Sequence, residues 1–150
     1  MTEPAGIVVG RSEESDHVLI RVRGRMHPGA TDFWDGNWLT SLIQVRAGGF
    51  TAWINAGLRA DELRDFRVAL ERVYAEVKGS ATLSTMEGWI ELTVECHPRG
   101  SLSISGTVVD DPGMGNTLHF EIDGLDQTDL PPLVDALVAV EERFPVLGSP

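Results

Sequence analysis

The sequence predicts an α+β protein: a largely antiparallel, curved sheet of about eight strands with two helices packed on one face, in the order ββββαββββα. Three observations support this prediction. Most short segments alternate apolar and polar side chains, as strands with one buried face do. Two longer segments repeat apolar residues at helical spacing. The links within each group of strands are short, which favours antiparallel pairing.

The bulk composition indicates one globular domain. The chain has 150 residues, of which 42% are hydrophobic and 23% charged, so it can bury a sizeable core. We expect a single domain over residues 1–150 with an ordered core at about 5–146. The N-terminus lacks a signal-peptide pattern and no stretch approaches the roughly 20 apolar residues of a membrane helix, so we expect a cytoplasmic protein. The single cysteine, Cys96, excludes an internal disulfide.

Charge is distributed unevenly along the chain, whose net charge is −11. Residues 1–79 carry ten basic and eleven acidic side chains, whereas residues 80–150 carry only Arg99 and Arg143 against twelve acidic ones. This asymmetry argues against nucleic-acid binding and would steer a basic protein partner. The alternative is that the acidity only keeps the protein soluble.

The first half begins with two strands, predicted at residues 7–9 and 17–25. In the second, apolar residues such as Val18 and Ile20 alternate with side chains that become cationic toward Arg25. One side of this strand is therefore expected to face the core and the other the solvent.

Residues 32–50 organise the chain. This stretch opens with the polar turn Asp-Phe-Trp-Asp-Gly-Asn-Trp, continues as an alternating strand and ends near a Gly-Gly pair. Because glycine reaches positive φ without steric cost, the pair predicts a hairpin with the alternating run at 50–59. The turn lacks the ligand spacing of a calcium loop, so Asp32 and Asn37 are expected to satisfy amides of an Asx-type turn.

A change of period marks each helix. The first is predicted over about residues 61–78, where apolar residues recur at helical spacing: Leu63, Phe66, Leu70, Val73, Tyr74 and Val77. Gly79 follows its last turn. The second helix starts near Thr128-Asp129, tolerates two prolines in its first turn and ends before Pro145.

The pattern of the segment between the helices predicts an antiparallel meander with one face on the core and one face exposed to solvent. It contains a short run around Leu83 and three alternating segments at 89–97, 101–108 and 118–123. Cys96 lies on the apolar side of its segment and is expected to be a buried, inert thiol.

The sequence contains no catalytic signature. Its four histidines are scattered without the spacing of a metal site, and no serine lies in a nucleophile-elbow context. The Gly-Met-Gly run at 113–115 lacks the strand and helix that a phosphate loop needs. We therefore expect no enzymatic activity, no catalytic residue, no metal and no cofactor, and a function performed on the outside of the molecule.

Acidic side chains gather on the wet faces of two predicted strands. Glu91 and Glu95 share the solvent-facing side of one strand, and Glu121 and Asp123 share that of another. If these strands lie in one sheet, their outer face is a docking surface for a basic protein, on which the acids would raise the association rate and the specificity. A plain solvated sheet face is the alternative interpretation.

Three tryptophans are candidate aromatic anchors for a partner, since tryptophan is enriched at interface hot spots. Trp34 and Trp38 flank the polar turn, and Trp53 lies on the strand that follows the Gly-Gly pair. We expect one of the two tryptophans of the turn to lie in the core or at its edge and leave the position of the other open.

Several of these motifs together resemble the WapI-type family of bacterial immunity proteins. The resemblance covers about residues 16–146 and rests on these segments: Asp-Phe-Trp-Asp-Gly-Asn-Trp-Leu at 32–39, Gly-Gly-Phe at 48–50, the helix with Leu63, Phe66, Leu70 and Tyr74, Asp-Pro-Gly at 111–113 with Asn116 and Leu-His-Phe at 118–120, Asp-Gln-Thr at 126–128 with Leu130 and Pro131, and Phe-Pro-Val at 144–146.

The resemblance implies a small cytosolic protein that binds and neutralises the toxin domain, typically a nuclease, of a contact-dependent growth-inhibition system. The expected partner is a basic protein domain rather than a nucleic acid or a membrane, and we expect a monomer or a weak homodimer. The residues alone leave two other interpretations open. One is a small-molecule binder with a pocket between sheet and helices, and the other is an oligomerising domain.

Overall fold

The computed structural model describes residues 5–150 of the chain. The strands within these residues are β1 (Ala5–Gly10), β2 (His17–Arg25), β3 (Trp38–Ala47), β4 (Phe50–Arg59), β5 (Gly79–Ser84), β6 (Ile90–Cys96), β7 (Ser101–Val109) and β8 (Thr117–Asp126). The helices are α1 (Phe33–Gly36), α2 (Ala60–Glu76) and α3 (Leu130–Arg143). Short 3-10 turns, Pro98–Gly100 and Gln127–Asp129, precede β7 and α3.

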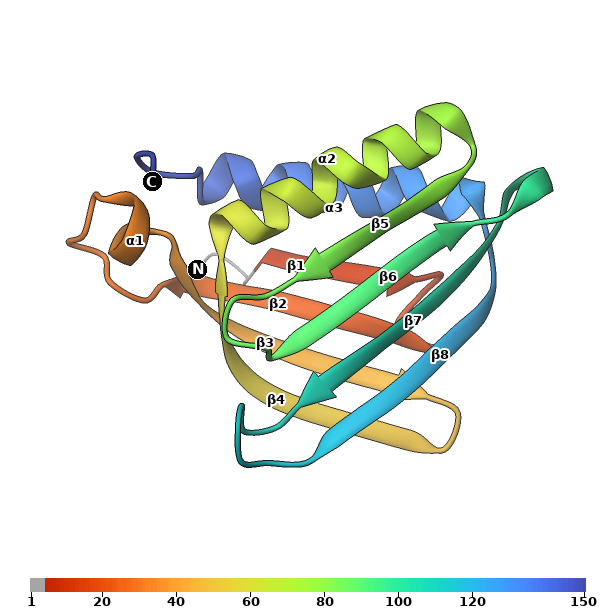
Figure 1. The fold of residues 1–150 in the computed structure, drawn as a ribbon, viewed down its shortest axis with the longest axis horizontal. Coiled ribbons are helices and arrows are strands. Elements are labelled where there is room, and N and C mark those ends of the chain that lie inside the picture. The colour runs from red at the N-terminus through yellow and green to blue at the C-terminus, as the bar shows by residue number, and fades with distance from the viewer. Residues whose placement is uncertain (1–4) are drawn as a thin grey trace.

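The strands form two four-stranded antiparallel sheets, in the orders β1-β2-β3-β4 and β5-β6-β7-β8. The predicted α+β class, the antiparallel pairing and the order ββββαββββα are confirmed. The eight strands are divided between two sheets, with α2 between β4 and β5 in the chain. The strands of the two sheets cross in the view of Figure 1.

Each long helix covers the first strand of the opposite half of the chain. Helix α2 follows β4 but packs against β5 and α3, while α3 follows β8 and packs against β1. Both helices lie on the same side of the molecule, and β4 and β8 lie on the other side (Figure 1). None of the helices within residues 5–150 combines the length and the apolar character that a membrane crossing requires.

One hydrophobic cluster joins both sheets and both long helices. Ile43 of β3, Leu92 of β6, Phe66 of α2 and Leu137 of α3 are each at most 2% exposed. Burying a side chain of this size contributes about 1.5–3 kcal/mol, so the apolar faces predicted by alternation and helical spacing hold the two sheets together. Cys96 belongs to this cluster and is buried, as its side of the strand predicted.

The ends of the long helices follow their local sequence closely. Helix α2 starts at Ala60 and ends at Glu76, within two residues of the prediction. Its first turn carries Asp61, at the end of the helix dipole that favours negative charge. Val77 terminates the helix in the left-handed region, with φ 51°. Helix α3 holds its prolines in the first turn, where an amide has no intrahelical acceptor.

Candidate functional site

The outer face of the β5–β8 sheet carries the acidic residues that the sequence places on wet strand faces. Strands β6 and β8 lie in this sheet with β7 between them. The register aligns Glu91 with Thr107 and then with His119 across the three strands, and it aligns Ser105 with Glu121. The condition for a shared outer face, that both acidic strands lie in one sheet, is therefore met.

A hollow of about 670 Å³ opens on this outer face. Its lining residues come from all three strands: Glu91, Thr93, Ser105, Gly106, Thr107, His119, Phe120 and Glu121. The central strand β7 contributes only small residues, whereas Glu91 on β6 and Glu121 on β8 carry longer side chains. The result is a polar hollow between two acidic strands.

Most of the charge on this face is uncompensated. Glu91, Glu95, Glu121 and Asp123 are all exposed. Within residues 5–150, ion pairs of these four are limited to Glu95, whose Oε1 lies 3.6 Å from Nδ1 of His97. The acidic outer face, defined by these four carboxylates, therefore presents negative charge to solvent.

The far end of β8 is different, because its acids are paired with an arginine. Nη2 of Arg11 lies 3.0 Å from Oδ2 of Asp129 and 4.0 Å from Oδ2 of Asp126. The hydrogen bond to Asp129 raises the pKa of Arg11. The side-chain hydrogen bond from Thr128 lowers the pKa of Asp126. These acids hold the start of α3 to the β1–β2 turn.

The tryptophans of the polar turn pack on a buried arginine. Arg59 is fully buried, and its guanidinium carbon lies 5.0, 5.7 and 4.8 Å from the ring centroids of Phe33, Trp34 and Trp38. Its Nη1 and Nη2 each donate a 2.7 Å hydrogen bond, to the carbonyl oxygens of Trp34 and Phe33. Its Nε donates to Oδ1 of Asp61 at 3.0 Å.

Arg59 is buried although it lies on the opposite face of β4 from the buried Leu58, so both faces are covered at this end of the strand. Burial of the guanidinium is tolerated because two carbonyl oxygens and a carboxylate replace its hydration. Residues 33–38 cover it, so its burial depends on a segment far away in the sequence.

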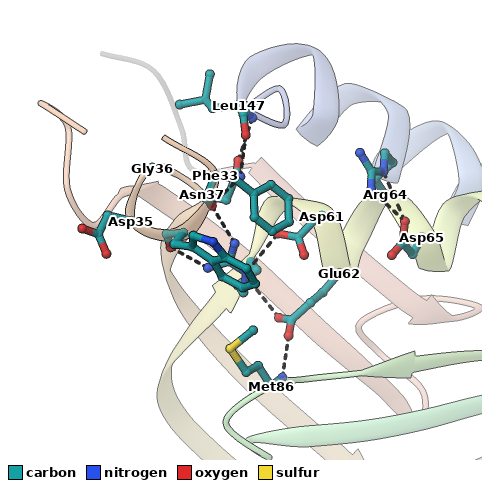
Figure 2. Close-up of polar contacts among 12 residues, drawn as sticks. Phe33, Asp35, Gly36, Asn37, Asp61, Glu62, Arg64, Asp65, Met86 and Leu147 are labelled. Carbon is teal, nitrogen blue, oxygen red and sulfur yellow. Dashed lines mark hydrogen bonds and ion pairs between the residues drawn. The ribbon is translucent and has the colours of Figure 1, made fainter. Parts of the chain in front are cut away.

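Asn37 joins the polar turn to the C-terminal segment. It is fully buried, and its Nδ2 donates 2.9 Å hydrogen bonds to the carbonyl oxygens of Phe33 and Leu147. The amide of Leu147 donates in return to Oδ1 of Asn37 at 2.8 Å (Figure 2). Oδ2 of Asp32 accepts from the amide of Asp35 at 3.1 Å. Asp32 therefore satisfies an amide of the turn as predicted, whereas for Asn37 the prediction was wrong, because its oxygen accepts from Leu147 outside the turn. The turn itself is the one-turn helix α1.

Trp53 is the most accessible of the three candidate anchors. Its exposed fraction is 62%, against 53% for Trp34, and Trp38 is partly buried. Because Trp34 and Trp38 pack against Arg59, both have a role in the fold. Trp38 is the more buried of the two tryptophans of the turn, and its ring contacts Arg59.

Glu62 connects the start of α2 to the turn between β5 and β6. Its Oε1 accepts from the amide of Arg59 at 2.8 Å, and its Oε2 accepts from the amide of Met86 at 2.5 Å (Figure 2). Burial raises the pKa of Glu62, while these two amides act in the opposite direction. The carboxylate therefore bridges the two halves of the chain.

The fold and these surfaces define a two-sheet α+β protein with an apolar core and an acidic outer sheet face. The chain belongs to the WapI-like family of immunity proteins, whose family model matches residues 9–145. The resemblance drawn from the sequence motifs is thereby confirmed. Proteins of such a family are typically not enzymes, and membership implies a cognate toxin as partner. A comparison with curated proteins gave no match.

Proposed function

We propose that this protein binds the toxin domain of a contact-dependent growth-inhibition system in the cytoplasm and neutralises it by occlusion, without enzymatic activity. The observation that carries the proposal is the acidic outer face, where Glu91, Glu95, Glu121 and Asp123 lie in and beside the 670 Å³ hollow. Membership of an immunity protein family supports a toxin as the partner.

The partner that fits this face is a basic domain, and we favour a nuclease. A nuclease holds phosphate groups with cationic side chains, so an acidic surface laid over that cleft would exclude the nucleic acid. Opposite charges across the interface would also accelerate encounter and reject unsuitable partners. The net charge of −11 has the required sign.

The interior gives less support to a small-molecule binder. Most of the buried side chains belong to one apolar cluster, whereas the 670 Å³ polar hollow lies on an outer face. Binding of a macromolecule on the outer face therefore agrees better with the position of the polar side chains than binding of a small molecule in the interior does.

Charge reversal on the acidic outer face tests the proposal. The probe is the cognate toxin domain, to be sought among the genes beside this one. Glu91→Lys with Glu95→Lys should weaken its binding by about 10- to 100-fold, mainly through a slower association rate. Surface plasmon resonance at two salt concentrations measures both effects, because screening should reduce the difference between variant and wild type.

A matched control applies the same change of charge to α3. Asp135 and Glu142 are exposed and lie on that helix, so their replacement by lysine alters the net charge equally at another site. This control should change the affinity by less than about three-fold, since long-range charge is largely screened. Equal losses in both double variants would remove the acidic outer face from the proposal.

A displacement experiment tests whether binding occludes the nucleic-acid site of the toxin domain. With a labelled oligonucleotide bound to the catalytically inactivated toxin domain, addition of this protein should release the oligonucleotide and lower its fluorescence anisotropy. A ternary complex with unchanged anisotropy would contradict occlusion and leave the binding itself in place.

A further inference from the structure

Two strand edges remain uncovered by helices. The sheet orders leave β1, β4, β5 and β8 at edges. Helix α3 packs against β1 and α2 packs against β5. Strands β4 and β8 lie on the side of the molecule opposite to the helices (Figure 1), and they are not paired with each other. An uncovered edge presents unpaired backbone amides and carbonyls that another strand can use.

Two further hollows lie along these edges. One, of about 350 Å³, lies between the β3–β4 turn at Gly48 and Gly49 and the segment of β8 at 118–121. The other, of about 250 Å³, lies between the segment of β4 at 51–54 and the turn that joins β7 to β8. Leu118 lines both, so the two hollows adjoin.

These hollows continue the acidic outer face. The 350 Å³ hollow shares His119, Phe120 and Glu121 with the 670 Å³ hollow. The three hollows therefore adjoin one another in turn, from the outer face of the β5–β8 sheet, past β8, to the edge of β4. We call the part between β8 and β4, lined by residues of the two smaller hollows, the edge path.

The edge path combines acidic and aromatic side chains. Asp16, Asp110 and Glu121 line it, and among the residues that line the three hollows none is lysine or arginine. Phe50 and Trp53 line it as well and are 66% and 62% exposed, respectively. Exposed aromatic side chains of this size are typical of binding sites.

The nearest cross-strand cation does not neutralise the edge path. Arg46 pairs with Thr51 across the β3–β4 hairpin. Its Nη1 donates to the carbonyl oxygen of Glu14 in the β1–β2 turn at 3.3 Å. The guanidinium is thus held by that turn and is not among the residues that line the hollows.

We propose that the edge path binds an extended segment of the toxin domain in which basic and apolar residues alternate, laid where the edges of β4 and β8 approach each other. Its basic side chains would face Asp16, Asp110 and Glu121, and separate apolar side chains would lie against Phe50 and Trp53, which are on opposite faces of β4. Backbone hydrogen bonds to a strand edge supply affinity in this mode of recognition, and alternate side chains supply specificity. The identity of the partner rests on the proposed function.

Aromatic truncation with the same toxin domain tests the edge path. Trp53→Ala should weaken binding by about 30-fold or more and Phe50→Ala by about 10-fold, as central aromatic anchors do. Both side chains are mostly exposed, so the variants should keep the wild-type circular dichroism. Tyr74→Ala, on the exposed surface of α2 and 48% exposed, is the control and should change the affinity by less than about three-fold.

The outcomes separate this inference from the proposed function. If the toxin domain binds wild type and all three variants equally, the edge path is overturned while the proposed function stands. If the toxin domain does not bind at all, the proposed function fails.

A defined peptide tests the edge path without the toxin. A capped Lys-Val-Lys-Val-Lys-Val peptide should shift the amide NMR signals of residues 50–54 and 117–121, whereas the Glu-Val counterpart should leave them unchanged. Signals that do not move with the Lys-Val peptide, or that move equally with both, contradict the inference.

Discussion

Arg59 connects three segments that are distant in the sequence. Its guanidinium lies among the rings of Phe33, Trp34 and Trp38 and bonds to two carbonyl oxygens of α1, while its backbone caps α2 through Glu62. A buried charge is tolerated only when its partners replace water completely. The polar turn therefore has a structural role, because its aromatic rings enclose the guanidinium of Arg59.

Replacing Arg59 by methionine should destabilise the protein strongly. The substitution removes the guanidinium donor from the carboxylate of Asp61 and the carbonyl oxygen of Trp34, and it leaves the carbonyl oxygen of Phe33 with only Nδ2 of Asn37. Removal of one partner from such a buried arrangement costs about 3–5 kcal/mol. Urea denaturation gives the change in the free energy of unfolding.

The matched control for Arg59→Met is Arg72→Met, at an exposed position of α2. Its effect should stay within about 0.5 kcal/mol, as is usual on a surface. A loss below about 1 kcal/mol for Arg59→Met would mean that the carbonyl oxygens find water in the variant.

At the scale of elements, local sequence determined the strands and helices well. Alternation predicted the segment that becomes β6 (Ile90–Cys96) because one face of that strand is buried and the other is wet. Helical spacing predicted α2 within two residues. Such patterns act over a few neighbours and need no knowledge of the rest of the chain.

Tertiary features were harder to predict because they depend on distant segments. Alternation gives each strand an apolar face but does not say where one sheet ends, so the division between β4 and β5 came only from the structure. The burial of Arg59 depends on Phe33 and Trp34, which approach it from residues far upstream. The shared outer face of Glu91 and Glu121, in contrast, followed from strand parity once both strands lay in one sheet.

The C-terminal end of α2 carries backbone strain that a single substitution should relieve. Val77 adopts φ 51° and ψ 40°, a conformation that is unfavourable for a β-branched residue. Its side chain is 39% exposed, so little packing would be lost. Val77→Gly should therefore raise the free energy of unfolding by about 1 kcal/mol, measured by urea denaturation.

Val68 supplies the control for Val77→Gly. It lies within α2 and is 47% exposed, but its backbone is helical. Val68→Gly should lower the stability by roughly 0.5 kcal/mol because glycine is the poorer helix former. If Val77→Gly also lowers the stability, the contacts of the Val77 side chain outweigh the backbone strain.

At the scale of the whole molecule, the two halves of the chain depend on each other. Helix α2 comes from the first half but covers β5, and α3 comes from the second half but covers β1. The inner faces of both sheets contribute to one apolar cluster. Either half alone would expose its sheet face and the edge of its first strand, which isolated sheets of this size do not tolerate well.

Two fragments cut between Lys78 and Gly79, both exposed, should therefore remain unfolded separately and refold on mixing. Circular dichroism and a cooperative thermal transition would report the recovery of structure.

Phe66→Ala in the first fragment should weaken reassembly by about 100-fold or more, since truncation of a buried phenylalanine costs about 3–5 kcal/mol. Val68→Ala, at an exposed position of the same helix, should leave reassembly nearly unchanged. A cooperative transition in either fragment alone would show that one sheet and one helix suffice for a stable core, in which case the exchange of helices between halves would add stability without being required for folding.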